Sequence, residues 1–162
     1  MKLPVSTEWL LHCATTLAQL EPGATASAAQ LADYYDLPAP YLAKQLQSLV
    51  KGGVLAATTG PRGGFRLARS ASEITLLRIV EAVDGASSPY ECREIRRQGR
   101  GALEPEQCRD MCILAAKMAE AHDAWRRSLE AVTLADILTE LPEWAPHRTR
   151  SRLTSPPRPP TD

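Results

Sequence analysis

The sequence carries no excess of charge of either sign. Its 162 residues hold 19 Lys and Arg against 19 Asp and Glu, so the formal net charge at pH 7 is zero. A neutral chain exerts no long-range attraction on nucleic acid or on a membrane surface. Binding to either partner must therefore come from a local patch of side chains.

Long apolar runs are also missing. No stretch approaches the roughly 20 apolar residues that a membrane-spanning helix requires, although 44% of the residues are hydrophobic. The first residues lack the continuous apolar run and the cleavage site of a signal peptide. We therefore expect a cytoplasmic protein with one compact domain and an appendage.

Recognisable catalytic motifs are absent as well. The chain has no Ser/His/Asp arrangement in a familiar local context and no internal repeat. Its glycine-rich stretch GPRGG (60–64) lacks the Gly-Lys-Ser/Thr end of a phosphate-binding loop, and the sequence after it does not predict a helix. We expect a protein that is not an enzyme.

The first half of the sequence has the element order of a winged helix-turn-helix. Apolar residues at helical spacing predict helices over 6–21, 27–36 and 41–51. Two short strand-like runs follow at 54–58 and 65–68, with a glycine-rich turn between them. In such a fold the third helix enters the major groove of DNA and the hairpin reaches the neighbouring phosphates.

The third predicted helix carries the polar side chains that DNA recognition needs. Such groups donate to phosphates or read base edges. Residues 1–70 hold six Lys and Arg against four Asp and Glu, a weakly positive balance. A solvated helix face beside a plain hairpin would show the same charges, and the element order favours DNA binding. The predicted DNA contacts are Tyr41, Lys44, Gln45, Gln47, Ser48, Lys51, Arg62 and Arg66.

The stretch LADYYDLPAPYLAKQLQSLVKGGVLAATTGPRGGFRLA (31–68) resembles the core of the iron–sulfur-cluster regulator family, the winged-helix repressors that include the IscR- and NsrR-type proteins. The motifs are YL-x-x-x-L-x-x-L-x-x-x-G and G-x-x-GGF-x-LA, and the similarity covers about residues 1–135. The resemblance implies a promoter-binding homodimer paired through long C-terminal helices. In many members it also implies a 2Fe–2S or 4Fe–4S cluster.

The predicted fold class is mainly α, a winged helix-turn-helix with a two-stranded wing and a long C-terminal dimerisation helix. We expect a DNA-binding domain over 1–85, a cluster-binding loop and dimerisation helix over 86–141, and a disordered basic tail over 142–162. The apolar stripe of the long helix, predicted over 106–131, is too long for one small winged domain to cover. A two-fold helix pair would bind a palindromic operator.

Four cysteines are present, and a reducing compartment favours thiols over structural disulfides. Cys13 lies in an apolar helix and is predicted to belong to the core. Cys92, Cys108 and Cys112 have fifteen and then three residues between them. Cluster-bearing family members usually carry three closely spaced cysteines, so this chain departs from the pattern.

The expected cluster ligands form two pairs with i, i+4 spacing. Cys108 and Cys112 fall at the start of the predicted long helix, where a helix N-terminus favours thiolate. Glu8 and His12 have the same spacing on the first helix. Imidazole ligates cluster iron in Rieske centres, and carboxylate is a harder and rarer ligand. We predict a 2Fe–2S cluster held by these four residues from both protomers, with Cys92 as the competitor for one position.

Trp9 adjoins Glu8 on the first helix, close to the DNA-binding unit. It is either an ordinary core aromatic or a switch whose rotamer carries the state of the cluster to the reading helix. The predicted function is a dimeric transcription repressor that senses redox state or nitric oxide through a 2Fe–2S cluster. The alternative is a metal-free winged-helix regulator that switches by oxidation of its cysteine thiols.

Overall fold

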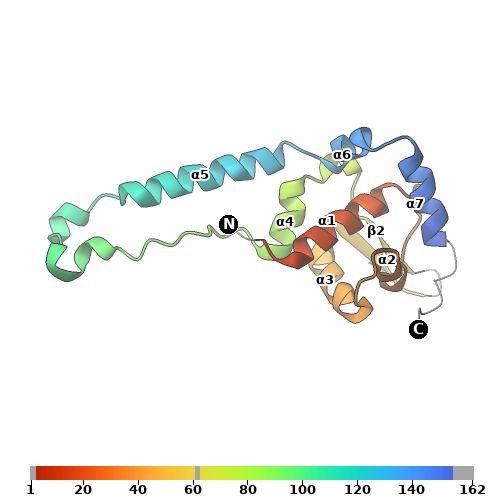
Figure 1. Cartoon of the computed structure of the whole chain (residues 1–162), viewed down its shortest axis with the longest axis horizontal. Helices are drawn as coiled ribbons and strands as arrows, with labels where there is room; N and C mark the ends of the chain where they lie inside the picture. The colour runs from red at the N-terminus through yellow and green to blue at the C-terminus, as the bar shows by residue number, and fades with distance from the viewer. Residues whose placement is uncertain (1–2, 61–62, 155–162) are drawn as a thin grey trace.

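Three helices and a two-stranded antiparallel wing follow one another at the start of the chain (Figure 1). The computed structural model describes residues 3–60 and 63–154. The helices are α1 (Val5–Ala18), α2 (Ala28–Tyr35) and α3 (Ala39–Lys51), and the strands are β1 (Leu55–Thr58) and β2 (Gly64–Leu67). In the wing, Leu55 is paired with Leu67. The predicted winged helix-turn-helix is confirmed.

Local sequence signals set the turn between α2 and α3. Ser27 and Gln30 cap the start of α2 reciprocally, since each side chain accepts a hydrogen bond from the backbone N–H of the other. Asp36 ends α2 in the left-handed conformation with φ 53°. Pro38 precedes α3 and Pro40 lies in its first turn, where a missing N–H costs nothing.

A leucine-rich core joins the three helices to the wing. The fully buried leucines include Leu10 of α1, Leu31 of α2, and Leu42, Leu46 and Leu49 of α3. Because α3 turns these leucines inward, its opposite face is left polar and accessible. Cys13 is also fully buried in this core, which confirms its predicted place.

The wing is held to the head by a short backbone contact. Ala26 and Phe65 exchange N–H···O hydrogen bonds of 3.0 and 2.8 Å, forming an isolated β-bridge outside the two strands. A Cβ on Gly64 would approach the Ala26 backbone to 2.7 Å, so glycine is needed there for the two chains to meet. The wing is thereby fixed beside α2.

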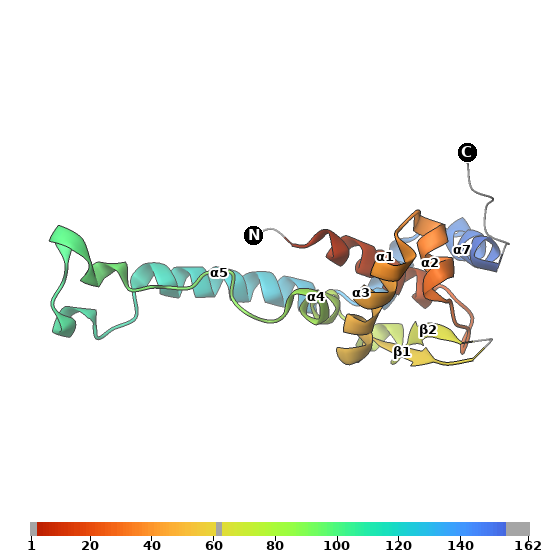
Figure 2. The ribbon, with the colours of Figure 1, turned by 90° about the horizontal axis from the view of Figure 1, so that it is seen from below.

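A long arm, residues 86–131, projects from this head (Figures 1 and 2). It begins after α4 (Leu76–Asp84), runs outward as an irregular segment with short 3₁₀ turns, and returns as α5 (Ile113–Glu130). None of the 18 residues of α5 is buried. The 3₁₀ turns are η2 (Ile95–Arg97), η3 (Gly99–Gly101) and η4 (Pro105–Cys108), and a further one, η1 (Ala71–Glu73), precedes α4.

The prediction that the long helix starts at residue 106 is wrong. The helix starts at Ile113, with Cys112 as its N-cap, and Cys108 ends the separate turn η4. The carbonyl oxygen of Asp110 accepts a hydrogen bond of 3.0 Å from the Arg96 side chain. It is therefore engaged outside a helical ladder, and the cysteines at 108 and 112 do not share one face of a regular helix.

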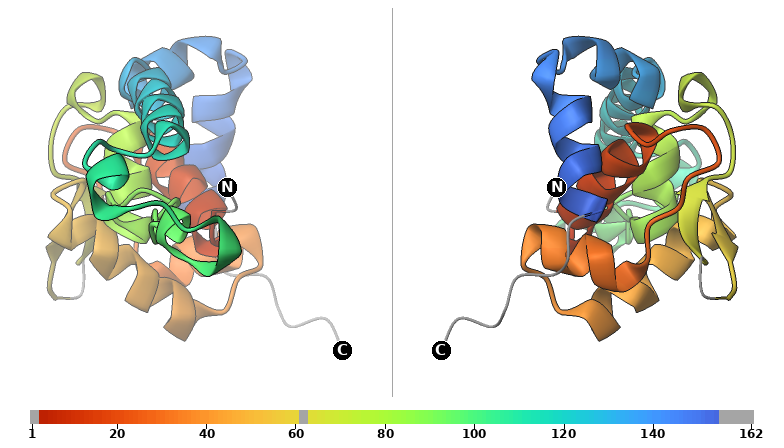
Figure 3. Two further views of the ribbon diagram at one scale, coloured as in Figure 1. Left: turned by 90° about the vertical axis from the view of Figure 1, so that its left-hand side faces the viewer. Right: turned by 90° about the vertical axis from the view of Figure 1, so that its right-hand side faces the viewer.

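The predicted disordered tail is also wrong for the part that the structure describes. After α6 (Leu134–Glu140), residues Trp144–Thr154 form α7, which packs beside α2 (Figure 3). Two buried side chains explain this packing: Leu153 joins the core, and Thr149 donates a 3.0 Å hydrogen bond to Gln19 of α1. Residues 155–162 of the predicted tail lie outside the described residues.

Replacing Leu153 with alanine tests whether α7 is part of the folded unit. The substitution removes buried apolar volume at a side chain that is 5% exposed, and it is expected to lower the free energy of unfolding by about 2–4 kcal/mol. Urea unfolding followed by circular dichroism measures the change. Arg152→Ala, at an exposed position of the same helix, is the matched control and should have little effect. Equal stability of the two variants would contradict the packing of α7.

Candidate nucleic-acid interface and cysteine site

The exposed face of α3 carries most of the predicted DNA contacts. Tyr41, Lys44, Gln47 and Lys51 are exposed, and Gln45 and Ser48 are partly exposed between them. On the wing, Arg66 is exposed on β2. Arg62 lies outside the described residues. The described side chains supply the groups that phosphates and base edges require, on the outer face of α3 and on the wing.

An aromatic contact joins α1 to the start of this surface. The ring of Trp9 meets the ring of Tyr41 edge to face, with 5.6 Å between centroids and 86° between planes. Trp9 is partly buried. Tyr41 is therefore open to solvent and also in contact with a residue that adjoins Glu8.

The tip of the arm brings Cys92 and Cys112 together. Both side chains line one cavity, although 19 residues separate them in the chain. The pKa of the Cys112 thiol is lowered, first by the backbone N–H groups of Ala115 and Leu114 at the start of α5 and then by the Arg96 guanidinium. Burial opposes these effects and does not outweigh them. The Cys112 thiol therefore loses its proton to form a thiolate more readily than an ordinary thiol does.

Arg96 organises the surroundings of the cysteines. It forms a bidentate ion pair with Glu94, at 2.5 and 2.8 Å, and donates to the Asp110 carbonyl. The pKa of Arg96 is raised chiefly by Glu94. The thiols of Cys108 and Cys112 raise it further by smaller amounts. Positive charge thus lies beside two of the three arm cysteines. The sequence analysis did not single out Arg96; the basic run RRQGR (96–100) was the available signal.

Cys108 and Cys92 differ in access. Cys108 is buried, at 7% exposed, whereas Cys92 is exposed at the end of the irregular segment. A cavity of about 310 Å³ at the tip is lined by Cys92 and Cys112 together with Arg96 and neighbouring residues. Cys108 does not line it. The accessible thiols at this site are therefore those of Cys92 and Cys112.

Glu8 and His12 form the second pair, on the head. Both are exposed and line a shallow cavity at the start of α1. Neither side chain has a hydrogen bond or ion pair with another described residue, and the His12 ring lies 5.8 Å from that of Tyr35. One carboxylate and one imidazole are thus free on the same face of α1.

A single chain does not bring the two pairs together. The cysteines lie at the tip of the arm and Glu8 and His12 lie on α1 of the head, with the length of α5 between them (Figures 1 and 2). Within residues 3–60 and 63–154, no three His, Cys, Asp or Glu side chains are placed to hold a metal ion.

The comparisons with known proteins agree with this architecture. Residues 3–140 match the model of the Rrf2 family, described as an iron-dependent transcriptional regulator. The chain is 30% identical to the HTH-type transcriptional regulator NsrR of Halalkalibacterium halodurans over 139 residues, which cover 86% of this chain and 91% of that protein.

Solved structures show the same fold. CymR, the global cysteine regulator of B. subtilis, superposes with a TM-score of 0.66 at 22% identity, covering 88% of this chain and 99% of that one. IscR of T. potens superposes with a TM-score of 0.65, also at 22% identity, covering 88% and 90%. The predicted class, a mainly helical winged helix-turn-helix with a long helix, is confirmed, and relatives of this kind are regulators and not enzymes.

The two environments of Cys112 and Cys13 predict a difference in reactivity in the metal-free, reduced protein. A lowered pKa gives Cys112 a thiolate fraction at lower pH, so its alkylation by iodoacetamide should reach half its maximal rate below the pH expected for an ordinary thiol. Burial raises the pKa of Cys13 to about 12, which keeps it a neutral thiol up to pH 10. Peptide mass spectrometry across pH 6–10 reports both sites. Equal pH profiles at the two positions would contradict these environments.

Proposed function

Because the chain belongs to the Rrf2 family of iron-dependent transcriptional regulators, we propose that it is a dimeric repressor that senses redox state or nitric oxide through a 2Fe–2S cluster. The observation that carries the proposal is the cavity on the arm that Cys92 and Cys112 line together with Arg96, away from the head. The polar surface of α3 would bind DNA, and the thiol site on the arm would detect the signal.

A second copy of the chain would cover the exposed apolar side chains of the arm. Ile113, Leu114 and Met118 are 76%, 69% and 43% exposed on α5. Apolar side chains on one projecting helix favour pairing with the same helix of another protomer. A two-fold pair of winged heads would bind a palindromic promoter site.

Pairing of the arms would also bring the tip of one arm to the head of its partner. The free carboxylate and imidazole of Glu8 and His12 would then face the thiols of the other protomer. The predicted cluster set is Glu8, His12, Cys108 and Cys112. The geometry of the tip favours Cys92 over Cys108 beside Cys112, since Cys92 is exposed and lines the same cavity as Cys112. When bound, the cluster would supply a one-electron redox centre.

The Trp9–Tyr41 contact supplies a path from this site to DNA. Glu8 and His12 flank Trp9 on α1, and Trp9 packs against Tyr41 on the reading surface. A change of charge at the two ligating side chains alters the field at the neighbouring indole ring. Movement of that ring would shift Tyr41, a predicted DNA contact.

The shared cavity of Cys92 and Cys112 also favours the alternative function. Two thiols that meet can lose two electrons and two protons to an oxidant and form a disulfide. A metal-free regulator would then use this bond to change the shape of the arm. The two functions share the DNA-binding surface and differ in whether iron is bound.

Anaerobic purification and reconstitution with iron and sulfide tests the cluster. The wild-type protein should show visible charge-transfer absorption and equal amounts of bound iron and sulfide. Loss of a single ligand at a four-ligand site is expected to remove most of this signal. The variants to compare are Glu8→Ala, His12→Ala, Cys92→Ala, Cys108→Ala and Cys112→Ala.

The Cys92 and Cys108 variants identify the second thiolate: whichever retains the spectrum is not a ligand. Cys13→Ala, at a core thiol outside both pairs, is the matched control and should retain it. A colourless, iron-free wild-type protein after reconstitution would refute cluster sensing. Reversible loss of the free thiols of Cys92 and Cys112 in that protein would support the disulfide alternative.

Trp9→Ala tests the path from the site to DNA. In the wild type, affinity for the protein's own promoter region should differ between the oxidised and reduced states. The substitution is expected to reduce this difference by about tenfold, which corresponds to about 1.4 kcal/mol of coupling. Mobility-shift assays under anaerobic conditions measure both states.

Two further variants show whether the effect is specific to the coupling. Trp144→Ala removes an indole that is 62% exposed on α7, and it should leave the redox dependence unchanged. Gln47→Ala, on the reading surface, should weaken binding equally in both states. An unchanged redox dependence in Trp9→Ala would exclude Trp9 as the switch.

A further inference from the structure

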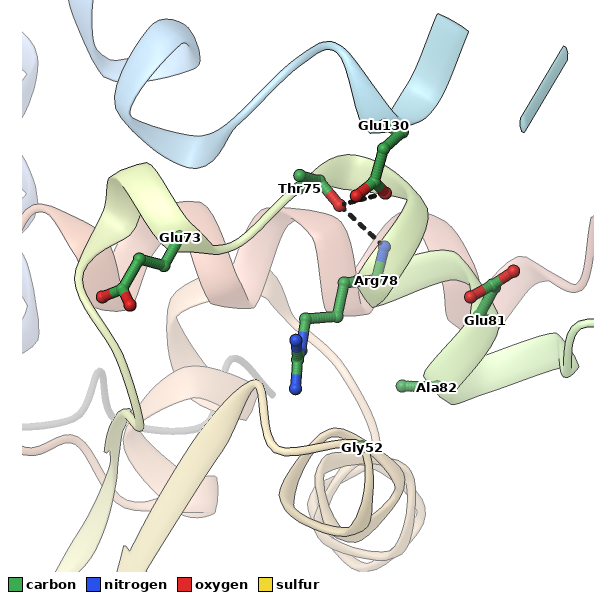
Figure 4. A pocket seen from close by; sticks show the side chains of 7 residues that line it. All are labelled: Gly52, Glu73, Thr75, Arg78, Glu81, Ala82 and Glu130. Carbon is green, nitrogen blue, oxygen red and sulfur yellow. Dashed lines mark hydrogen bonds between the residues drawn. The ribbon is translucent and has the colours of Figure 1, made fainter. Parts of the chain in front are cut away.

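A further cavity lies where α3, the proposed DNA-reading helix, meets α4 and α5 (Figure 4). It is far from the arm cysteines. Its volume is about 410 Å³, a size typical of sites for small molecules. The lining side chains are mostly polar and come from the end of α3, from η1, from α4 and from the last turn of α5. They are Gly52, Glu73, Thr75, Arg78, Glu81, Ala82 and Glu130.

Arg78 points into this cavity without a partner. Figure 4 shows its guanidinium extending from α4 toward the end of α3 at Gly52, with the carboxylates of Glu73, Glu81 and Glu130 standing apart from it around the cavity. Its Nε is buried and makes no hydrogen bond, and no ion pair joins it to a carboxylate of the described residues. Buried donors are usually satisfied, so an unpaired guanidinium nitrogen beside a cavity indicates a missing acceptor.

The three carboxylates have other partners than Arg78. Glu81 pairs with Arg126 of α5. Glu73 accepts hydrogen bonds from the backbone and side chain of Ser70. Glu130 accepts a 3.0 Å hydrogen bond from the Thr75 hydroxyl. Each acidic group is held by a neighbour, and the fork of Arg78 faces the cavity alone.

The charges of the lining define the chemistry of the ligand. The planar fork of an arginine matches a carboxylate, which it binds through two parallel hydrogen bonds. A ligand with several negative charges would be repelled by Glu73 and Glu130 on either side. A ligand that carries an ammonium group next to its carboxylate would satisfy both the arginine and the acidic groups.

We propose that this cavity binds a free α-amino acid, with the ligand's carboxylate on Arg78 and its ammonium group toward Glu73 and Glu130. The site stands on different residues from the cysteine site, so it does not depend on the proposed cluster. The ligand would touch the end of the reading helix at Gly52 and the end of α5 at Glu130. Binding of the amino acid would therefore act on α3, the proposed DNA-reading helix, and on α5, the proposed dimerisation helix.

Thermal-shift screening of the full-length, metal-free protein with the common L-amino acids tests the proposal. At saturation, at least one amino acid should raise the Tm by about 2 °C or more. Calorimetric titration then compares each amino acid that raises the Tm with the carboxylic acid that lacks its amine and with the amine that lacks its carboxylate. Both analogues should bind at least about tenfold more weakly.

Variants of the cavity assign the binding to these residues. Arg78→Met should abolish it, and Arg78→Lys should retain part of it, since lysine keeps the charge and loses the fork. Glu130→Gln should weaken the amino acid more than the carboxylic acid, and it serves as a second test where Arg78→Met does not fold. Arg148→Met, at an exposed arginine on α7, should bind as the wild type does.

Three results would overturn the proposal. The first is the absence of heat and of a Tm shift with every amino acid. The second is undiminished binding in both Arg78 variants and in Glu130→Gln. The third is binding of the carboxylic acid, or of inorganic phosphate, as tightly as the amino acid, which would make the cavity a simple anion site.

Discussion

A helix with no buried side chain is the constraint on which the rest of this structure depends. α5 has 18 residues, all of them at least partly accessible, and its exposed residues include Ile113 and Leu114. An isolated helix of this length is marginally stable in water, and most helical stability in proteins comes from packing against another element. Packing against a second surface along its length would therefore stabilise the arm. The dimer proposed above would supply that surface through the same helix of a second copy.

Because the arm projects from the head, the candidate ligands of the chain fall into two separate groups. The arm ends in thiols with a nearby guanidinium, and the head carries a free carboxylate and imidazole on α1. Neither group offers the four ligands that an iron–sulfur cluster requires. The proposed shared site would couple cluster binding to association of the protomers, because each copy would supply only half of the ligands of any one site.

The sequence was sufficient for the head because its signals are local and periodic. The leucines of α3 repeat at helical spacing, and glycines mark the turn of the wing, so the order of the elements could be predicted. The arm cysteines were harder to place, since their arrangement depends on the long-range hydrogen bond from Arg96 to the Asp110 carbonyl. The sequence spacing of Cys108 and Cys112 suggested a helical pair, whereas the fold brings Cys92 to Cys112.

The C-terminal segment was missed for a related reason. Its composition of Pro, Thr and Arg gives little helical signal, and α7 is held by a few specific contacts made through Thr149 and Leu153. Composition reports the average character of a segment and not its particular partners. Arg78 likewise reads as a normal surface residue of α4, and only the packing of three helices around it leaves its guanidinium facing a cavity.

The root of α5 is fastened to the head at several points. Arg126 pairs with Glu81, Glu130 accepts from Thr75, and the backbone of Thr75 bridges to Thr133 just beyond the helix. From this root the helix extends about 27 Å at 1.5 Å per residue, so it acts as a lever. A tilt of about 5° at the root would displace the tip by about 2 Å. A small rearrangement of the head at the root of α5 would thus become a larger displacement of the thiols at the tip. A displacement of the tip would in turn apply a torque to α4 through the contacts at the root.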